Sequence, residues 1–262
     1  MSQSFEIYVI SLKNQIDRRE KIKKIFQDQS LAWSFFDAIS GKEIAPYLHM
    51  YDRKKRLQTP GYDLRDNEIA CFLSHRALWE ECSKGTLPFL ILEDDIKINE
   101  NLGNFSAIEN IINKITNTIN PDFLLIRFGS LFKREFTKIK PIDENFCIVR
   151  YHRDPSTAMG YLISPYVAKK LVASSQKFFT AVDDFMWRGW ENNCCFLDIS
   201  PTLFFTEDSD TPSTIGDRSK PKLNIFKKIR REWFRSIDTY HRNSYEKYIL
   251  HELIKNKSKF FH

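Results

Sequence analysis

The chain has 262 residues, of which 42% are hydrophobic and 28% are charged, which suits a globular protein of one large domain with or without an appendage. No run of 18 or more apolar residues occurs, which excludes a helix that spans a bilayer, and residues 1–6 lack the basic start and apolar core of a secretory signal. The five cysteines have no spacing typical of a zinc site, so we expect free thiols in a reducing cytoplasm.

The net charge of +6 is unevenly distributed along the chain. Residues 218–262 carry 13 Lys and Arg against 4 Asp and Glu, a net charge of +9, whereas residues 1–217 carry 27 against 30, a net charge of −3. The sequence therefore predicts a mildly acidic body (residues 1–217) and a strongly basic tail (residues 218–262) that needs an explanation of its own.

The first segment of the body has the pattern of a strand followed by a helix. Residues 5–12 (FEIYVISL) are apolar and β-branched, and the residues after Asp17 open a helical pattern. In open α/β sheets the loop between such elements is a common nucleotide site. There is no glycine-rich phosphate loop, so Arg18 and Arg19 would have to supply the contact to an anion. A solvated start of a helix is the alternative.

Residues 33–39 predict a short second strand, and residues 42–65 predict an irregular, exposed excursion of the length typical of a lid or mobile segment. Residues 66–82 then predict a helix capped by Asp66. Ser74 and His75 fall within a largely apolar turn of this helix. A histidine in such a place is more often a hydrogen-bonded core residue than a ligand.

The most informative segment is residues 87–96, where an apolar run leads directly into Glu93, Asp94 and Asp95. The pattern predicts a buried strand that ends in an acidic cluster, with Glu93 and Asp95 on one side and Asp94 on the other. Adjacent carboxylates raise one another's pKa unless a cation lies against them. Carboxylates at the end of a strand suit Mg²⁺ or Mn²⁺ that also binds substrate phosphates. An acidic turn after a core strand is the alternative.

The rest of the body continues to alternate between helices and strands, which predicts an α/β protein with a mainly parallel sheet. Pro165 marks the first position of a helix. The other expected elements are a helix over residues 105–119, a short helix that begins at 181, strands over residues 122–128, 145–151, 157–164 and 194–199, and a helix-compatible stretch in the tail over residues 222–250.

Four pieces occur in one order: VISL followed by DRRE, the helix EIACFLSHRALWE, the strand LPFLILEDD, and TAMGYLISPYVAKKL leading to AVDD. Together they resemble glycosyltransferase family 25, which includes bacterial lipooligosaccharide galactosyltransferases. The resemblance covers roughly residues 5–215 and leaves the tail out. It implies a GT-A type fold with a Rossmann-like, mainly parallel sheet and flanking helices over residues 1–217.

The resemblance also implies an inverting glycosyltransferase that moves a hexose, most simply galactose from UDP-galactose, onto a lipooligosaccharide or other glycan acceptor. The implied cofactor is Mn²⁺ or Mg²⁺. A UDP-glucose or UDP-N-acetylhexosamine donor is an alternative, and so is a catalytically silent carbohydrate-binding protein with the same fold. A metal-dependent phosphoesterase would require more His and Asp ligands than the sequence offers.

Carried onto this sequence, the resemblance makes Asp95 a metal ligand and places Glu93 against the metal or the donor ribose. Asp94 completes the acidic motif and is also implied in donor binding. Asp183 is implied as the catalytic base, with Asp184 as the substitute and capping of a helix as the alternative role. A late histidine often completes such metal sites, but residues 200–217 contain none. The positions implied for donor binding are Ser11, Leu12, Arg18, Ala38 (near uracil), Ser74 and His75, and the substitutes for the missing ligand are Glu207, Asp208 and Asp210.

The tail mixes basic residues with aromatic ones, such as Trp233 and Phe234 beside Arg230 and Arg231. This combination suits an anionic membrane surface. It agrees with an enzyme at the inner face of the cytoplasmic membrane that modifies a lipid-linked acceptor. A structural helix closing over the body is the main alternative; nucleic acid can use the same ingredients but is not the expected partner.

Overall fold

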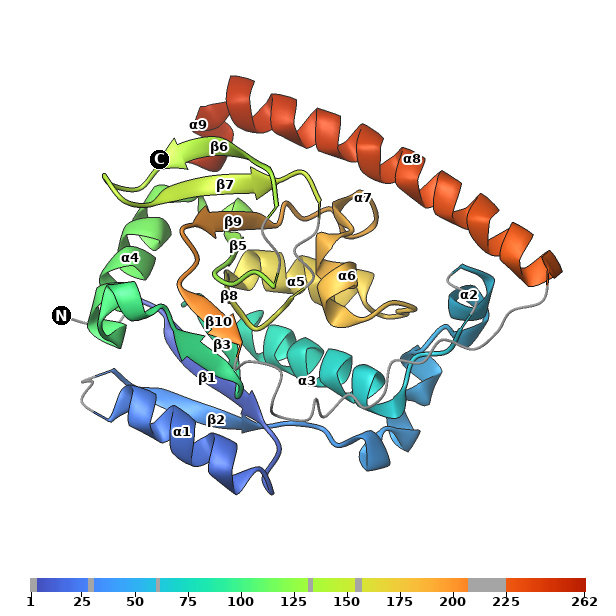
Figure 1. Cartoon of the computed structure of the whole chain (residues 1–262), viewed down its shortest axis with the longest axis horizontal. Coiled ribbons are helices and arrows are strands. Elements are labelled where there is room, and N and C mark those ends of the chain that lie inside the picture. Colours follow the sequence, from blue (N-terminus) through green and yellow to red (C-terminus); the bar gives the residue numbers. More distant parts are fainter. Residues whose placement is uncertain (1–3, 28–30, 60–61, 132–133, 154–156, 207–224) are drawn as a thin grey trace.

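The computed structural model describes residues 4–27, 31–59, 62–131, 134–153, 157–206 and 225–262. In these ranges the chain forms a central mixed sheet with helices on both of its faces (Figure 1). This confirms the α/β class and is consistent with a GT-A type fold. The boundary expected between residues 217 and 218 lies outside the described residues.

The large sheet has eight strands in the order β2-β1-β3-β8-β5-β9-β7-β6, and a separate pair joins β10 to β4. Strands β2, β1 and β3 are mutually parallel, as are β5 and β9, whereas β8 is antiparallel to both of its neighbours. Strands β7 and β6 complete the antiparallel end. The strands are β1 (Glu6–Ser11), β2 (Trp33–Asp37), β3 (Phe89–Glu93), β4 (Ile96–Ile98), β5 (Leu125–Arg127), β6 (Phe136–Pro141), β7 (Cys147–Tyr151), β8 (Gly160–Ile163), β9 (Leu197–Ser200) and β10 (Phe204–Thr206).

Most predicted helices are present, with ends that differ by a few residues. The helix of residues 66–82 has the predicted bounds, but its N-cap is Arg65 and Asp66 is its first residue, so the predicted cap is wrong. The excursion over residues 42–65 is not wholly irregular, because it contains three short helices. The helices are α1 (Ile16–Phe26), α2 (Arg53–Gln58), α3 (Asp66–Cys82), α4 (Phe105–Thr118), α5 (Pro165–Ser174), α6 (Val182–Trp187), α7 (Gly189–Asn192), α8 (Ile225–Lys255) and α9 (Lys257–Phe260), and the 3₁₀ helices are η1 (Gly41–Glu43), η2 (Ala45–Met50), η3 (Glu100–Leu102) and η4 (Pro121–Phe123).

Strand β3 lies in the middle of the sheet and contributes to the cores on both of its faces. Leu90 and Leu92 pack with apolar side chains of α1 and α4, whereas Phe89 and Ile91 pack with those of α3, α5 and α6. Successive strand residues point to opposite faces, which is why the first four positions of β3 are all apolar. This strand therefore fixes the position of whatever follows it.

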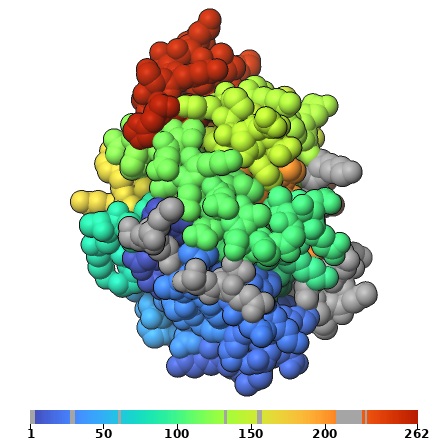
Figure 2. Space-filling model, turned by 90° about the vertical axis from the view of Figure 1, so that its left-hand side faces the viewer, coloured from blue at the N-terminus to red at the C-terminus, as the bar shows by residue number. Residues whose placement is uncertain are grey.

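The second half of the tail is packed against the body. Ile249 and Leu253 of α8 and Phe260 of α9 are buried in the same core as α4. Glu246 forms an ion pair with the fully buried Arg150 of β7. Figure 2 shows these helices at one end of the molecule and the N-terminal segment at the other.

The first half of α8 leaves a row of large apolar side chains exposed, among them Phe226, Ile229 and Trp233. Helix α8 is 31 residues long. However, no helix in the described ranges combines the length and apolarity needed to cross a membrane.

Candidate functional site

The acidic cluster lies where the parallel strands β1 and β3 end. The register pairs Ile10 of β1 with Glu93 of β3, so Ser11 lies beside the start of the cluster. Strand β3 ends at Glu93, and Asp94 and Asp95 form the turn before β4. Carboxyl ends of neighbouring parallel strands meet at one edge of a sheet, which is where ligands bind in open α/β folds.

Asp94 is held by groups from β1 and α1. The Ser11 hydroxyl donates to one carboxylate oxygen at 2.7 Å, and the Arg18 guanidinium donates to the other at 2.9 Å. Both side chains of the Arg18–Asp94 pair are largely shielded from solvent. The neighbouring Arg19 instead pairs with Asp37 at 2.7 Å and donates to the Ser11 carbonyl. Asp94 thus ties the acidic turn to the start of α1 and brings Arg18 next to the cluster.

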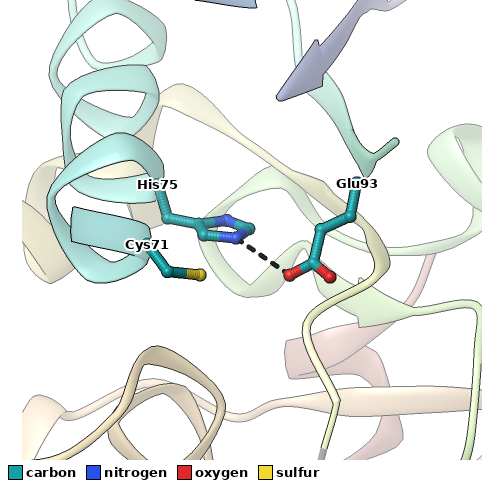
Figure 3. A group of neighbouring side chains, drawn as sticks. All are labelled: Cys71, His75 and Glu93. Carbon is teal, nitrogen blue, oxygen red and sulfur yellow. Dashed lines mark hydrogen bonds and ion pairs between the residues drawn. The ribbon is translucent and has the colours of Figure 1, made fainter. Parts of the chain in front are cut away.

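Glu93 points to the opposite side, toward helix α3. His75 Nε2 lies 3.3 Å from Glu93 Oε1 (Figure 3). On the other side of the ring, His75 Nδ1 lies 2.9 Å from the Tyr161 hydroxyl. That hydroxyl oxygen accepts the indole N–H of Trp79 at 2.8 Å. The chain of bonds assigns the tautomer: Tyr161 donates to Nδ1, and the proton on Nε2 is donated to Glu93. Buried groups of β8 and α3 therefore fix the Glu93 carboxylate.

Cys71 joins this arrangement, and the sequence interpretation missed it. Its sulfur, the His75 ring and the Glu93 carboxylate offer three ligand atoms that lie within 4.8 Å of one another. Burial, followed by the charges of Glu93, Asp183 and Asp95, raises the pKa of the Cys71 thiol well above its usual value. The signal that could have found it is the spacing of four residues to His75, which puts both side chains on one face of a helix.

Asp95 is the least satisfied member of the cluster. Its Oδ1 atom is shielded from solvent and has no hydrogen-bond partner in the part of the chain that the structure describes. Burial and the neighbouring Glu93 raise the pKa of Asp95 to about 7, with Arg18 acting in the opposite direction. A shielded, unsatisfied carboxylate oxygen next to a second carboxylate fits a hard divalent cation. The expected pair of ligands, Asp95 and Glu93, is therefore chemically suited to Mn²⁺ or Mg²⁺.

The other residues implied for the donor lie around the same end of the sheet, but not all are accessible. The Ser74 hydroxyl accepts a hydrogen bond from the backbone N–H of Ile39, in the segment after β2. It donates to the carbonyl of Ala70, which lies one turn earlier in α3. Ser74 and His75 are fully buried, so they act on a ligand only through the groups that they hold. Ala38 donates its backbone N–H to the Ser11 carbonyl, and Ala38 and Leu12 are partly exposed.

Asp183 lies in the first turn of α6, with Asp184 next to it. The residue at the N-cap of this helix is Ala181, so neither aspartate is the cap. The charge of Asp183 contributes to the raised pKa of Cys71, so this carboxylate is within electrostatic reach of the acidic cluster. The expected substitutes for a late histidine ligand, Glu207, Asp208 and Asp210, lie outside the described residues.

Comparisons with known proteins agree with this arrangement. The sequence profile of "Glycosyltransferase family 25 (LPS biosynthesis protein)" matches residues 4–186, which include the acidic cluster, α3 and all but the last residue of α6. "Lipooligosaccharide biosynthesis protein lic2B" of Haemophilus influenzae is 32% identical over 174 residues, 63% of this chain and 62% of the relative. A "Glycosyltransferase 25 family member" of Drosophila melanogaster is 32% identical over 176 residues, 64% of this chain and 28% of the relative.

"Procollagen galactosyltransferase 1" of Danio rerio is 27% identical over 191 residues, 69% of this chain and 30% of the relative. The chain thus spans less than two thirds of the length of these relatives. The family profile nevertheless covers more than half of this chain, including every described residue that the sequence singled out for donor, metal or base. The chain belongs to glycosyltransferase family 25.

Proposed function

We propose that the protein is an inverting glycosyltransferase that moves a hexose, galactose from UDP-galactose in the first instance, onto a lipooligosaccharide or other glycan acceptor. The observation that carries the proposal is the acidic cluster at the carboxyl ends of the neighbouring parallel strands β1 and β3. It combines one carboxylate neutralised by Arg18, one fixed by His75, and one, on Asp95, with an unsatisfied oxygen. The names of the relatives supply the class of sugar and acceptor.

In this proposal Asp95 and Glu93 hold Mn²⁺ or Mg²⁺, which when bound acts as a Lewis acid toward the diphosphate. Arg18 lies beside the cluster, where its bond to Asp94 holds it. It supplies charge-assisted hydrogen bonds to the diphosphate oxygens, where negative charge accumulates as the bond to the sugar breaks. Leu12 and Ala38 line the nucleoside side of the same site.

The acceptor hydroxyl must lose its proton as it attacks the anomeric carbon, and inversion requires a base on the face opposite the leaving group. We assign this role to Asp183. Its charge acts on Cys71 beside Glu93, which supports a place near the donor, whereas the charge of Asp184 acts on Arg188, away from that group. A carboxylate base contributes a factor of about 10² to 10⁴ in rate.

The test compares Asp183→Asn with Asp184→Asn, two substitutions of the same kind at neighbouring positions. Sugar transfer is assayed with a panel of UDP-sugars and a glycan acceptor, with Mn²⁺ and with excess chelator, and UDP binding is titrated by calorimetry. We expect Asp183→Asn to retain UDP binding and to lose transfer by about 10² to 10⁴, and chelation to abolish transfer in the unsubstituted protein.

Near-normal transfer by Asp183→Asn would remove Asp183 from the role, and a comparable loss in Asp184→Asn alone would assign the base to Asp184. Binding of UDP-sugars without turnover on any acceptor would instead favour a catalytically silent carbohydrate-binding protein. Transfer that is highest with UDP-glucose or UDP-N-acetylhexosamine would change the donor and leave the reaction class intact.

We also propose that the enzyme acts on a lipid-linked acceptor at the inner face of the cytoplasmic membrane, held there by the first half of α8. The exposed Phe226, Ile229 and Trp233 lie one turn apart on this helix, next to the exposed Lys228 and Arg230. Aromatic side chains with flanking cations favour an anionic lipid surface. Cosedimentation with anionic and neutral vesicles tests the idea; equal binding to both, or to neither, contradicts it.

A further inference from the structure

A cavity of about 620 Å³ lies between α2, the α6–α7 segment and the first half of α8. Figure 1 shows α8 running along one edge of the molecule from α9 past α7 to α2. Side chains of α8 such as Arg231 and Phe234 form one wall of the cavity. The volume is in the range of small-molecule binding sites. Its walls include Asp184 but neither Asp183 nor the carboxylates that follow β3.

The walls combine aromatic side chains with an excess of cations. Tyr62, Trp190 and Phe234 contribute aromatic rings from three different segments. Five Lys and Arg side chains face three carboxylates, so the lining is positive even before histidine is counted. Aromatic faces suit the apolar faces of sugar rings, and guanidinium groups suit carboxylates and phosphates.

Two of the three carboxylates of the cavity, Glu191 and Asp238, are paired inside the protein. Arg188 binds Glu191 at 2.8 Å and Asp238 at 2.9 Å, and Lys55 lies 3.3 Å from Glu191. This network joins α7 to α2 and α8. The positive charge that remains for a ligand is carried by arginines outside this network, among them Arg56 and Arg231.

Arg56 is buried, and its hydrogen bonds go to the backbone carbonyls of Tyr62 and Phe179, which are neutral acceptors. Arg231 pairs with Glu232 on the surface of α8. Such an exposed pair is weak and a ligand anion can replace it. The cavity therefore offers guanidinium groups from two different helices, α2 and α8, to an acidic ligand.

Helix α6 connects the cavity to the acidic cluster. Consecutive residues of an α-helix point about 100° apart, and here Asp183 acts on the thiol beside Glu93 while Asp184 lines the cavity. Helix α6 thus carries one aspartate on the cavity and another whose charge acts on the group beside Glu93. In an inverting transfer the base acts on the acceptor hydroxyl as it attacks the donor, so an acceptor site next to α6 is consistent with Asp183 as the base.

We propose that this cavity is the acceptor site and that it binds an anionic oligosaccharide, with sugar rings against Trp190 and Phe234 and the acidic group between Arg56 and Arg231. The proposal rests on the proposed glycosyl transfer and adds the acceptor's charge. Both uronic-acid and phosphorylated sugars have this chemistry. It also gives the tail a part in the reaction, since one wall of the site comes from α8.

The experiment measures binding of three trisaccharides of the same hexoses to the full chain by calorimetry: one ending in a uronic acid, one bearing a 6-phosphate, and one neutral. Arg231→Glu is compared with Arg230→Glu, the same charge change on an exposed neighbour that does not line the cavity. We expect at least one acidic trisaccharide to bind more tightly than the neutral one, and Arg231→Glu to weaken it about tenfold or more. Arg230→Glu is expected to bind like the unsubstituted protein.

Three results would overturn the assignment. They are equal binding of acidic and neutral trisaccharides, equal weakening of binding by both substitutions, and no binding of any of the three trisaccharides. UDP is titrated in the same samples to separate this result from the proposed function. UDP binding together with failure of the trisaccharides overturns the cavity and leaves the transferase intact. Trisaccharide binding in a protein that does not bind UDP overturns both the transferase and the acceptor role.

Discussion

Removing the Glu246 carboxylate is expected to destabilise the whole protein, because it leaves a buried guanidinium without its counter-charge. Arg150 is fully buried, and Glu246 accepts from its Nε at 3.0 Å and from Nη2. Its other partners are neutral: the Phe196 carbonyl and the ring of Trp187, 3.8 Å from the guanidinium carbon. Breaking such a buried pair from one side costs about 3–5 kcal/mol in the free energy of unfolding.

Urea unfolding followed by tryptophan fluorescence measures this change for Glu246→Ala. The matched control is Glu232→Ala, which removes a carboxylate from an exposed pair on the same helix and should leave the transition almost unchanged. In the double substitution Arg150→Met with Glu246→Leu, both charges are gone, and most of the lost stability should return. A loss below about 1 kcal/mol for Glu246→Ala would refute the reasoning, because it would mean that α8 is not integral to the body.

The remaining predictions concern the acidic cluster, the fit of the tail and the buried hydrogen bonds. Below its raised pKa of about 7 Asp95 is protonated, and a bound cation must displace that proton. The affinity for Mn²⁺, measured by electron paramagnetic resonance, should therefore rise as the pH is raised from 6 to 8. An affinity that does not change with pH would contradict Asp95 as a ligand. Gly189→Ala would place a methyl group 2.3 Å from atoms of α8, whereas the same change at Gly85 meets nothing nearer than 3.5 Å. Gly189→Ala should therefore lower the melting temperature, at a cost of about 1–3 kcal/mol in stability. Equal melting temperatures of the two variants would contradict close packing of Gly189 against α8. Tyr161→Phe removes the hydroxyl that joins two side chains of α3, and urea unfolding should show a loss of about 1–3 kcal/mol; an unchanged midpoint would show that those bonds carry no net stability.

Much of the fold could be predicted because its signals are local. The bounds of α3 match those predicted from its apolar stripe, and Pro165 does begin α5, with Ser164 as the N-cap. Strand β6 was missed because its sequence, FTKIKP, is polar and basic, which suits a strand at the end of a sheet but not the apolar pattern that was sought. Strands β4 and β10 have three residues each, too few for a periodicity to be seen.

Within the candidate site, the sequence located the acidic cluster but not the contacts that distinguish its three carboxylates. The opposite sides expected for two of them hold: Asp94 turns to Arg18, and Glu93 turns to His75. However, the reason is a turn after Glu93 and not continued strand alternation. That Tyr161 would orient His75 could not be predicted, because the two residues meet only when β8 pairs with β3.

The tail is a second case in which contacts between distant segments could not be predicted from local sequence. Its basic and aromatic composition favoured a membrane surface, with a structural helix as the alternative. The structure makes the second half of the tail structural, because Ile249 and Leu253 are buried and Glu246 pairs with Arg150. Composition could not reveal this, since the partner of Glu246 lies 96 residues earlier in the chain.

The insertion of β8 between β3 and β5 has a consequence for synthesis on the ribosome. Strand β3 is complete when residue 93 has emerged, but the strand that pairs with its second edge begins only at residue 160. During that interval the nascent chain presents an apolar strand, FLILE, with one row of backbone groups open to other chains. Such an edge favours intermolecular pairing. Translation halted after residue 93 and before residue 160 has emerged should therefore yield chains that aggregate or bind chaperones. Chains extended past residue 163 should do neither.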